Sequence, residues 1–137
     1  MAFWLMKSEP YKFSWAQLVV DGRNGWDGVR SYQARNNLSA MRLGDQAFFY
    51  HSNEGLEIVG ISEIIREAYP DASDPTGRFV MVDIKPVRPL ARPVTLKAIK
   101  AEPRLADFLL VRQSRLSVIP VRPEEWALVC DMGGVAA

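Results

Sequence analysis

The sequence predicts an α+β fold in which helices pack around a small, strongly bent sheet or open barrel. Its 137 residues suit one domain, and a hydrophobic content of 48% is enough to build a core. The predicted elements follow the mixed order β-α-α-β-β-β-α-β-α, with consecutive strands in the middle of the chain. Strands that follow one another between helices favour a bent sheet with helices at its sides. We therefore expect residues 1–137 to form one domain.

The N-terminal part of the chain predicts a strand, two helices and a second strand. FWLMK, at 3–7, is a short apolar run typical of a buried strand. A helix should follow Ser14, which is its predicted N-cap, and should end near Gly22. A second helix is predicted from about 31 to 42. QAFFYHS, at 46–52, is apolar on both faces and predicts a central strand.

The C-terminal part predicts three strands and two helices. The strands are expected at 57–65, 79–87 and 115–121, and the helices at 95–101 and from Pro123 onward. In the strand at 79–87, Val82 and Ile84 alternate with Asp83, so one face is expected to meet water. Gly133 is the predicted C-cap of the last helix.

The charge of the chain is distributed unevenly. The net charge is +1, but residues 53–83 carry a local balance of −5 and residues 85–122 a local balance of +7. Such asymmetry is compatible with a face that meets phosphates, and equally with ordinary solvated surface charge.

The composition also bears on the compartment. No apolar run approaches the roughly 18 residues that a membrane span needs. The N-terminus lacks the basic start and the small-residue cleavage site of a signal peptide. The single cysteine, Cys130, cannot form an internal disulfide. Together these features predict a cytoplasmic protein with no membrane partner, and a monomer is the default expectation.

The second predicted helix has two distinct faces. Ala34, Leu38 and Met41 fall on one stripe, which is expected to face the core. Tyr32 and Asn36 are neighbours on the face nearly opposite that stripe. This face either lines a second concavity, where a ring and an amide would contact a ligand, or is simply solvated.

Polar residues continue apolar rows at two strand ends. Lys7 and Glu9 extend the apolar row of the first strand, and His51 does so in the strand at 46–52. Trp26 lies in the loop before the second helix and is either buried or free to bind. Such strand ends can mark the mouth of a pocket or the protein surface.

Signals for catalysis are weak. One histidine and one cysteine cannot build a zinc site of the usual kind, and no nucleophile-elbow or phosphate-loop motif is present. We expect no metal, no cofactor and no catalytic residue. Lys7 and Glu9 could act as an acid–base pair if they were buried together, although an ion pair at the rim is the simpler interpretation.

The sequence resembles a known family over nearly its whole length. The segments that carry the resemblance run nearly end to end along the chain: LMKSEP, WDGVRSYQARNNL, FFYHS, IVGISEIIREAYPD, VTLKAIKAEP, LVRQSRLSVIPV and EEW. They are similar to the EVE domain family. One departure is visible, because the family pattern reads Asn where this chain has Ser31. The resemblance implies a PUA-like pseudo-barrel, with a curved mixed β-sheet flanked by helices, over residues 1–137.

The family resemblance also implies a site. It implies a pocket beside the sheet that binds modified nucleobases. Carried over by motif, the pocket residues are Lys7, Ser8, Glu9, Trp26, Val29, Tyr32, Asn36, His51 and Ser52. Within this set, Trp26 and Tyr32 are assigned to stacking, and Ser8 and Asn36 to the Watson–Crick edge. The candidate phosphate contacts are Arg30, Arg35, Arg112 and Arg115.

The resemblance, together with the polar and aromatic residues above, implies a non-catalytic module that binds nucleic acid, DNA or RNA, through a flipped, modified base of the 5-substituted cytosine type. One alternative is a small amidohydrolase-like enzyme that acts on a modified nucleoside and uses Lys7 and Glu9. Another is a module that binds a small ligand or a protein through the same pocket. The residues alone leave these alternatives open.

Overall fold

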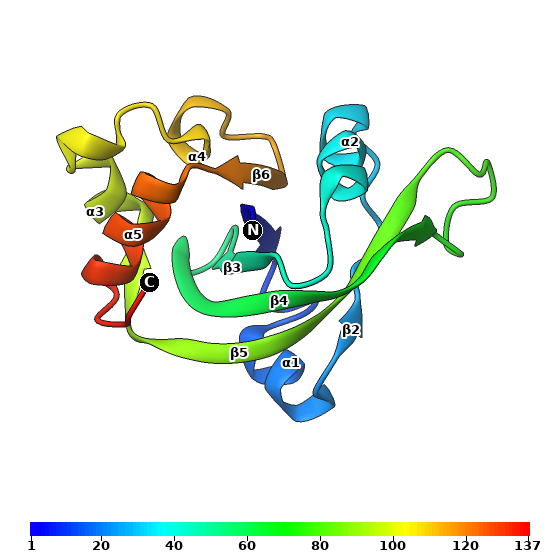
Figure 1. The fold of residues 1–137 in the computed structure, drawn as a ribbon, viewed down its shortest axis with the longest axis horizontal. Coiled ribbons are helices and arrows are strands. Elements are labelled where there is room, and N and C mark those ends of the chain that lie inside the picture. The colour runs from blue at the N-terminus through cyan, green and yellow to red at the C-terminus, as the bar shows by residue number, and fades with distance from the viewer.

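The computed structural model describes residues 1–137 and is organised around one mixed six-stranded sheet (Figure 1). The strands are β1 (Phe3–Ser8), β2 (Asn24–Gly25), β3 (Gln46–His51), β4 (Glu57–Pro70), β5 (Val80–Thr95) and β6 (Val118–Val121). Their order across the sheet is β2-β5-β4-β3-β1-β6. Only β1 and β3 run parallel, and every other neighbouring pair is antiparallel.

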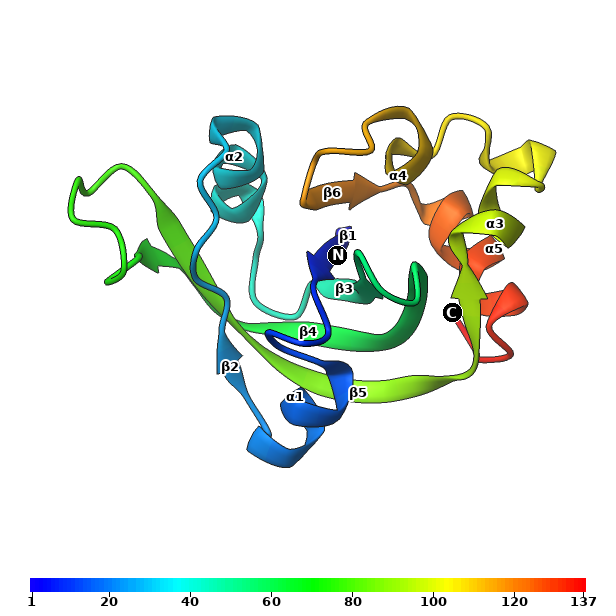
Figure 2. The same cartoon turned by 180° about the vertical axis from the view of Figure 1, so that it is seen from behind.

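The sheet is strongly curved because β4 and β5 form a long irregular hairpin. These strands contain 14 and 16 residues, and their register shifts at four points. Each shift inserts a bulge that increases the local bend and twist of the strands. In both views the hairpin forms a band that curves around β1, β3 and β6 (Figures 1 and 2). The predicted curved mixed sheet flanked by helices is confirmed.

The helices lie around the rim of this sheet. They are α1 (Trp15–Asp21), α2 (Tyr32–Ala40), α3 (Leu96–Lys100), α4 (Leu109–Arg112) and α5 (Pro123–Met132), with a 3-10 turn, η1, at Pro103–Leu105. Helix α2 stands near the turn of the β4–β5 hairpin, whereas α3 and α5 lie at the opposite end of the sheet (Figures 1 and 2). None of the helices combines the length and apolar character that crossing a bilayer requires.

Several predicted helix boundaries are confirmed. The Ser14 hydroxyl accepts a hydrogen bond from the Gln17 amide at 3.1 Å, and Gly22 closes α1 in the left-handed conformation with a φ of 77°. Ser31 caps α2 from outside the helix. The predicted C-cap at Gly133 is correct in position, but its φ is −82°, so a positive φ does not explain the glycine. A Cβ there would lie 2.9 Å from Leu90.

Strand β5 runs well past its predicted end at residue 87. It continues to Thr95 through Pro89 and Pro93, although prolines normally interrupt a sheet. The edge of β5 opposite β4 is paired with β2 only at Asp83 and Ile84. Beyond that pairing no other strand lies along this edge, so a proline costs no hydrogen bond between strands there.

Two further sequence expectations need correction. Strand β4 extends to Pro70 rather than to residue 65. Asp83 is buried rather than solvated: it accepts a hydrogen bond from the Arg23 guanidinium at 2.8 Å and one from the Tyr69 hydroxyl. The alternation of apolar and polar residues therefore identified the strand correctly. On its polar face Arg23 and Tyr69 cover Asp83, whereas Lys85 is exposed as expected.

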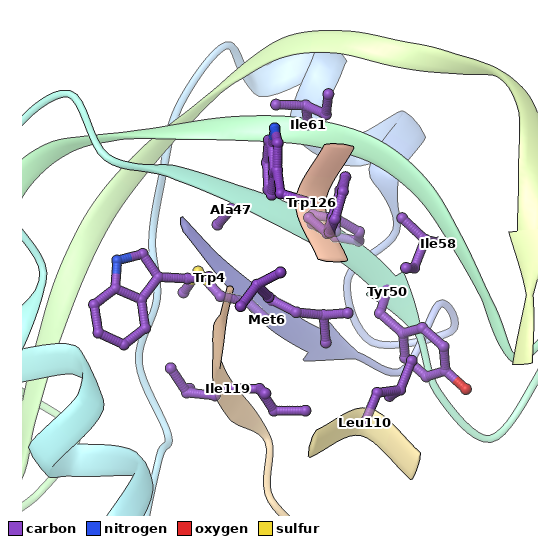
Figure 3. Packing of buried hydrophobic residues seen from close by; sticks show 14 of the residues in the cluster. Trp4, Met6, Ala47, Tyr50, Ile58, Ile61, Leu110, Ile119 and Trp126 are labelled. Carbon is purple, nitrogen blue, oxygen red and sulfur yellow. The ribbon is translucent and has the colours of Figure 1, made fainter. Parts of the chain in front are cut away.

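The core lies inside the curve of the sheet and is centred on aromatic rings. Trp126 of α5 stacks on Phe48, with ring centroids 3.9 Å apart, and on Phe3, with centroids 4.5 Å apart. Figure 3 shows Trp126 packed among residues of the sheet, with Tyr50 and Leu110 at one edge of the cluster. The predicted stripe of α2 (Ala34, Leu38 and Met41) is fully buried, as expected.

Candidate functional site

A cavity of about 830 Å³ opens where β1 and β3 end. Its volume lies within the range of small-molecule sites. Four segments line it: Lys7–Phe13 at the end of β1, Asn24–Arg30, Tyr50–Leu56 at the end of β3, and Leu96–Ser117 from α3 to the start of β6. Since these segments are far apart in the sequence, only the folded chain creates the cavity.

The parallel pairing of β1 with β3 places the mouth of the cavity. Lys7 lies opposite Tyr50, and Ser8 lies opposite His51. The last link between the two segments is the Ser52 amide, which donates to the Ser8 carbonyl at 2.9 Å. Because both strands end at the same level, the chains diverge beyond this bond and leave their terminal side chains around a hollow.

A buried carboxylate holds the loop that forms the second wall. Asp71 is 3% exposed, and its Oδ2 accepts from the Gly28 amide at 2.9 Å and from the Arg30 guanidinium at 3.0 Å. Its Oδ1 accepts from the amide and the hydroxyl of Ser73. Burial alone would raise the pKa of Asp71, but the hydrogen bonds from Ser73, Gly28 and Arg30 outweigh it and lower the pKa to about 2.

Trp26 is a fixed part of the cavity wall. Its side chain is 8% exposed and meets Phe13 and Phe49 edge to face, with ring centroids 6.2 Å and 5.6 Å apart. Its amide donates to the Val82 carbonyl at 2.7 Å. Trp26 is therefore both a core residue and a lining residue, so the two interpretations of its sequence position hold together.

The polar side chains at the end of β1 have separate partners. The Lys7 ammonium donates to the Ser114 carbonyl at 2.8 Å, and burial lowers its pKa. The Ser8 hydroxyl donates to the Phe13 carbonyl at 2.5 Å. Glu9 faces the Lys12 ammonium at 3.6 Å. A hydrogen bond from Tyr11, then the charge of Lys12, lower the pKa of Glu9 despite its partial burial. The ion pair expected between Lys7 and Glu9 does not form.

The structure brings six of the nine predicted pocket residues to the cavity. These are Lys7, Ser8, Glu9, Trp26, Val29 and Ser52. The other three, Tyr32, Asn36 and His51, lie away from it. The expectation that Trp26, Tyr32 and Asn36 border one shared cavity is therefore corrected.

Tyr32 and Asn36 face the turn of the β4–β5 hairpin instead. The Tyr32 ring is 53% exposed and stacks on Phe79, with centroids 5.3 Å apart, while the Arg35 guanidinium lies 4.9 Å from its centre. The Asn36 side-chain oxygen accepts from Arg35 at 2.9 Å. The helical wheel identified a face that avoids the core, but neighbouring side chains of the surface already occupy the Tyr32 ring.

His51 points toward α1. Its Nε2 accepts a hydrogen bond from the Trp15 amide at 3.1 Å, and its ring meets Phe49 edge to face. Burial lowers the pKa of His51, which favours the neutral form that this acceptor role requires. His51 thus helps to hold the start of α1, on the side of β3 away from the cavity.

The four arginines predicted to contact phosphate do not lie together. Arg30 and Arg115 line the cavity. Arg112 and Arg115 line a second, shallower hollow of about 380 Å³. Arg35 lines neither hollow, and it packs on Tyr32.

Sequence reasoning missed the lining residues contributed by distant segments. These include Phe13, Tyr50, Leu56, Leu96, Leu110, Ser114 and Ser117. Tyr50 carried a usable signal, because it lies near the end of a strand whose exit was already a candidate pocket mouth. The others sit in loops or short helices, where no periodic pattern indicates which way a side chain faces.

The titratable groups do not suggest a metal site. The structure brings together no group of three or more His, Cys, Asp or Glu side chains that could hold a metal ion. Cys130 is fully buried in the core, and burial raises the pKa of its thiol to about 11. At neutral pH the thiol is therefore protonated and poorly nucleophilic.

The curved open sheet, its flanking helices and the cavity at the ends of β1 and β3 define a PUA-like α+β protein. The pattern of the EVE domain matches residues 2–132, and the chain belongs to the EVE domain family. Human thymocyte nuclear protein 1 is 37% identical over 163 residues, which covers 94% of this chain and 72% of that protein.

Solved structures support the same relationship. A protein from Rhodopseudomonas palustris is 62% identical, with a TM-score of 0.93 over 98% of this chain and 94% of that one. The human THYN1 protein, solved in complex with DNA containing 5-methylcytosine, is 35% identical, with a TM-score of 0.93 over the full length of both chains. An ASCH protein from Zymomonas mobilis is 14% identical, with a TM-score of 0.59 over 96% of this chain and 95% of that one, and shares the fold alone.

Proposed function

We propose that this protein binds DNA through a modified cytosine, such as 5-methylcytosine, which is flipped out of the duplex into the cavity and is not chemically altered. The observation that carries the proposal is the cavity of about 830 Å³ between Trp26 and the end of β1. The human THYN1 protein, which was crystallised with 5-methylcytosine DNA, supports it through a similar fold over the whole chain.

The cavity offers contacts that offset the cost of flipping a base. Unstacking and unpairing one base costs a few kcal/mol, and contact with aromatic side chains returns roughly 1–3 kcal/mol per base. Trp26, Phe13 and Tyr50 supply aromatic walls, with Val29 and Leu110 beside them. A methyl group at position 5 adds apolar area, and burying it contributes about 0.8 kcal/mol.

The polar lining suits the amino group of cytosine. Because the Ser8 hydroxyl gives its proton to the Phe13 carbonyl, it presents lone pairs to a ligand. Glu9 and Asp27 add carboxylates to the same cavity. Acceptors of this kind pair with the exocyclic amine of cytosine, which thymine lacks. We assign Ser8 and Glu9 to that amine, and Trp26 and Val29 to the ring and its methyl group.

The proposal also covers the oligomeric state, the compartment and RNA. Residues 1–137 would act as one monomeric binding domain in the cytoplasm, and the same cavity would accept a modified base in single-stranded RNA. The alternative of an amidohydrolase-like enzyme has no comparable support, because Lys7 and Glu9 are held by different partners.

The direct test compares two DNA duplexes that differ by one 5-methylcytosine. Fluorescence anisotropy is expected to show binding of the methylated duplex about four- to tenfold tighter, because one buried methyl group contributes roughly 1 kcal/mol. A third duplex carries thymine in place of the 5-methylcytosine. Thymine keeps the 5-methyl group but lacks the exocyclic amine, so this duplex should bind like the unmodified one. Equal affinity for all three duplexes would contradict the proposal.

A further inference from the structure

The second hollow directly adjoins the cavity. It measures about 380 Å³ and shares Ser114 and Arg115 with the larger cavity. Its other wall is the first turn of α2, where Ser31 and Gln33 line it, and Arg112 stands at its far side. The two hollows therefore lie side by side and meet at Ser114 and Arg115. We call the second hollow the arginine groove; it is lined by Ser31, Gln33, Arg112, Gln113, Ser114, Arg115 and Leu116.

The arginine groove differs in chemistry from the cavity. Its lining contains two guanidinium groups, two amides and two hydroxyls, with Leu116 as the one apolar residue and no carboxylate, whereas Glu9 and Asp27 line the cavity. Guanidinium, amide and hydroxyl groups are the donors that proteins direct at phosphate oxygens. The groove is thus suited to a polar anion and poorly suited to an apolar ligand.

The floor of the arginine groove is fixed in place. The Gln33 side-chain amide donates to the Gln113 side-chain oxygen at 2.9 Å and joins α2 to the segment after α4. The Lys7 ammonium holds the same segment through the Ser114 carbonyl. Arg112 donates to the Ala106 carbonyl at 2.8 Å and lies 3.6 Å from Asp107. These contacts position the groove without using Arg115.

Arg115 is the cation that remains available to a ligand. Its side chain is exposed, and it makes no hydrogen bond or ion pair with the protein. It stands on the ridge between the two hollows, because it lines both. Arg30, the other arginine at the cavity, is held by Asp71 and Ser73 instead.

We infer that the arginine groove binds the sugar–phosphate backbone of the DNA strand next to the flipped base, with Arg115 on the phosphate nearest the cavity. This inference rests on the proposed function, since it requires a strand whose base enters the cavity. A base that leaves the duplex carries its own phosphates to the rim, so the neighbouring backbone must follow the surface beside the opening. The arginine groove is the carboxylate-free hollow next to that opening, from which Ser114 and Arg115 separate it.

The test measures affinity against salt concentration for the Arg115→Gln protein and for the native protein. A lost phosphate contact should weaken binding of methylated and unmethylated duplexes by the same factor, about three- to tenfold near 100 mM salt. It should also reduce the slope of log Kd against log salt by about 1. Lys85→Gln is the matched control, because Lys85 is exposed and lines neither hollow.

The possible outcomes separate this inference from the proposed function. If Arg115→Gln behaves like Lys85→Gln in both affinity and slope, the backbone role is wrong. If it weakens only the methylated duplex and leaves the slope unchanged, Arg115 contacts the base, which also overturns the inference. If the native protein does not prefer the methylated duplex, the proposed function fails. The change in slope on unmethylated DNA then still shows whether the arginine groove binds the backbone.

Discussion

Replacing Ser52 by tryptophan is expected to weaken binding to 5-methylcytosine DNA about 30-fold or more while leaving the protein folded. Ser52 lines the cavity, is only half-buried, and its hydroxyl makes no hydrogen bond with the protein. An indole at this position would fill the space that the base needs. The loss of its aromatic and apolar contacts corresponds to about 2 kcal/mol. Anisotropy gives the affinity, and thermal unfolding monitored by circular dichroism checks the fold.

Ser39→Trp is the control for adding an indole to the surface. Ser39 is exposed at the C-terminal end of α2 and lines neither hollow. Its affinity for the methylated duplex should match that of the native protein. If Ser52→Trp also binds like the native protein while remaining folded, the base does not enter this cavity.

The second large effect is expected for Asp71→Asn, which should lower the free energy of unfolding at pH 7 by about 2 kcal/mol. The asparagine amide has the size of the carboxylate but no negative charge. The hydrogen bonds that Gly28 and Arg30 donate to Oδ2 of Asp71 would therefore be weakened or lost. The magnitude follows from the pKa, which falls from the ordinary 3.8 to about 2 in the folded protein. Urea unfolding measures it. The preference for methylated DNA should fall as well, because the loop from Trp26 to Arg30 loses its anchor.

The same carboxylate predicts a dependence of stability on pH. The pKa of Asp71 is lower in the folded state than in the unfolded state, so its contribution is fully present above about pH 4. That contribution is lost as the pH falls toward 2, where the folded protein also takes up the proton. The gap in stability between the native protein and Asp71→Asn should therefore narrow across this range.

Asp131→Asn provides the comparison for the Asp71 experiment. Asp131 is exposed on α5, and its carboxylate makes no hydrogen bond. Its replacement should change the free energy of unfolding by no more than about 0.5 kcal/mol. If Asp71→Asn is as stable as Asp131→Asn at pH 7, or if its gap from the native protein does not narrow in acid, Asp71 does not anchor the loop.

Local sequence patterns predicted the core and the ends of several elements. The stripe of Ala34, Leu38 and Met41 is buried because helical periodicity alone decides which face an apolar row presents. Ser14 caps α1 because its hydroxyl bonds an amide only three residues away. Properties of this kind depend on neighbours within one turn, so the sequence contains them directly.

Features that depend on contacts between distant segments could not be predicted from the sequence. Tyr32 was free in the helical wheel, yet in the fold it lies against Phe79 at the hairpin, which no local pattern could reveal. The role of Asp71 depends on Gly28 and Arg30, which approach it only after the sheet has curved. Strand β5 continues beyond its predicted end at residue 87, because the sequence does not show that one of its edges is paired with another strand only at Asp83 and Ile84.

The candidate site shows the same division. The strand-end pattern predicted Lys7 and Glu9 at a pocket mouth, and the family resemblance added Ser8 and Ser52. All four line the cavity, because the parallel pairing of β1 with β3 brings the two strand ends together. His51 was assigned from the same pattern and does follow Phe49 on one face of β3, where the two rings meet edge to face. That face meets α1, whereas Tyr50, on the other face, lines the cavity. The walls from α3, α4 and the segment before β6 required the complete fold.

The most direct test of the central claim is an NMR measurement on the protein bound to a short duplex with a single 5-methylcytosine, its methyl carbon labelled with ¹³C. If the base occupies the cavity, nuclear Overhauser effects should connect that methyl group with the Trp26 ring and the Val29 methyl groups, which line it. The effects that link the methyl group to its stacked neighbour bases in free DNA should disappear. A bound methyl group that keeps those base contacts and shows none to Trp26 or Val29 would contradict the account.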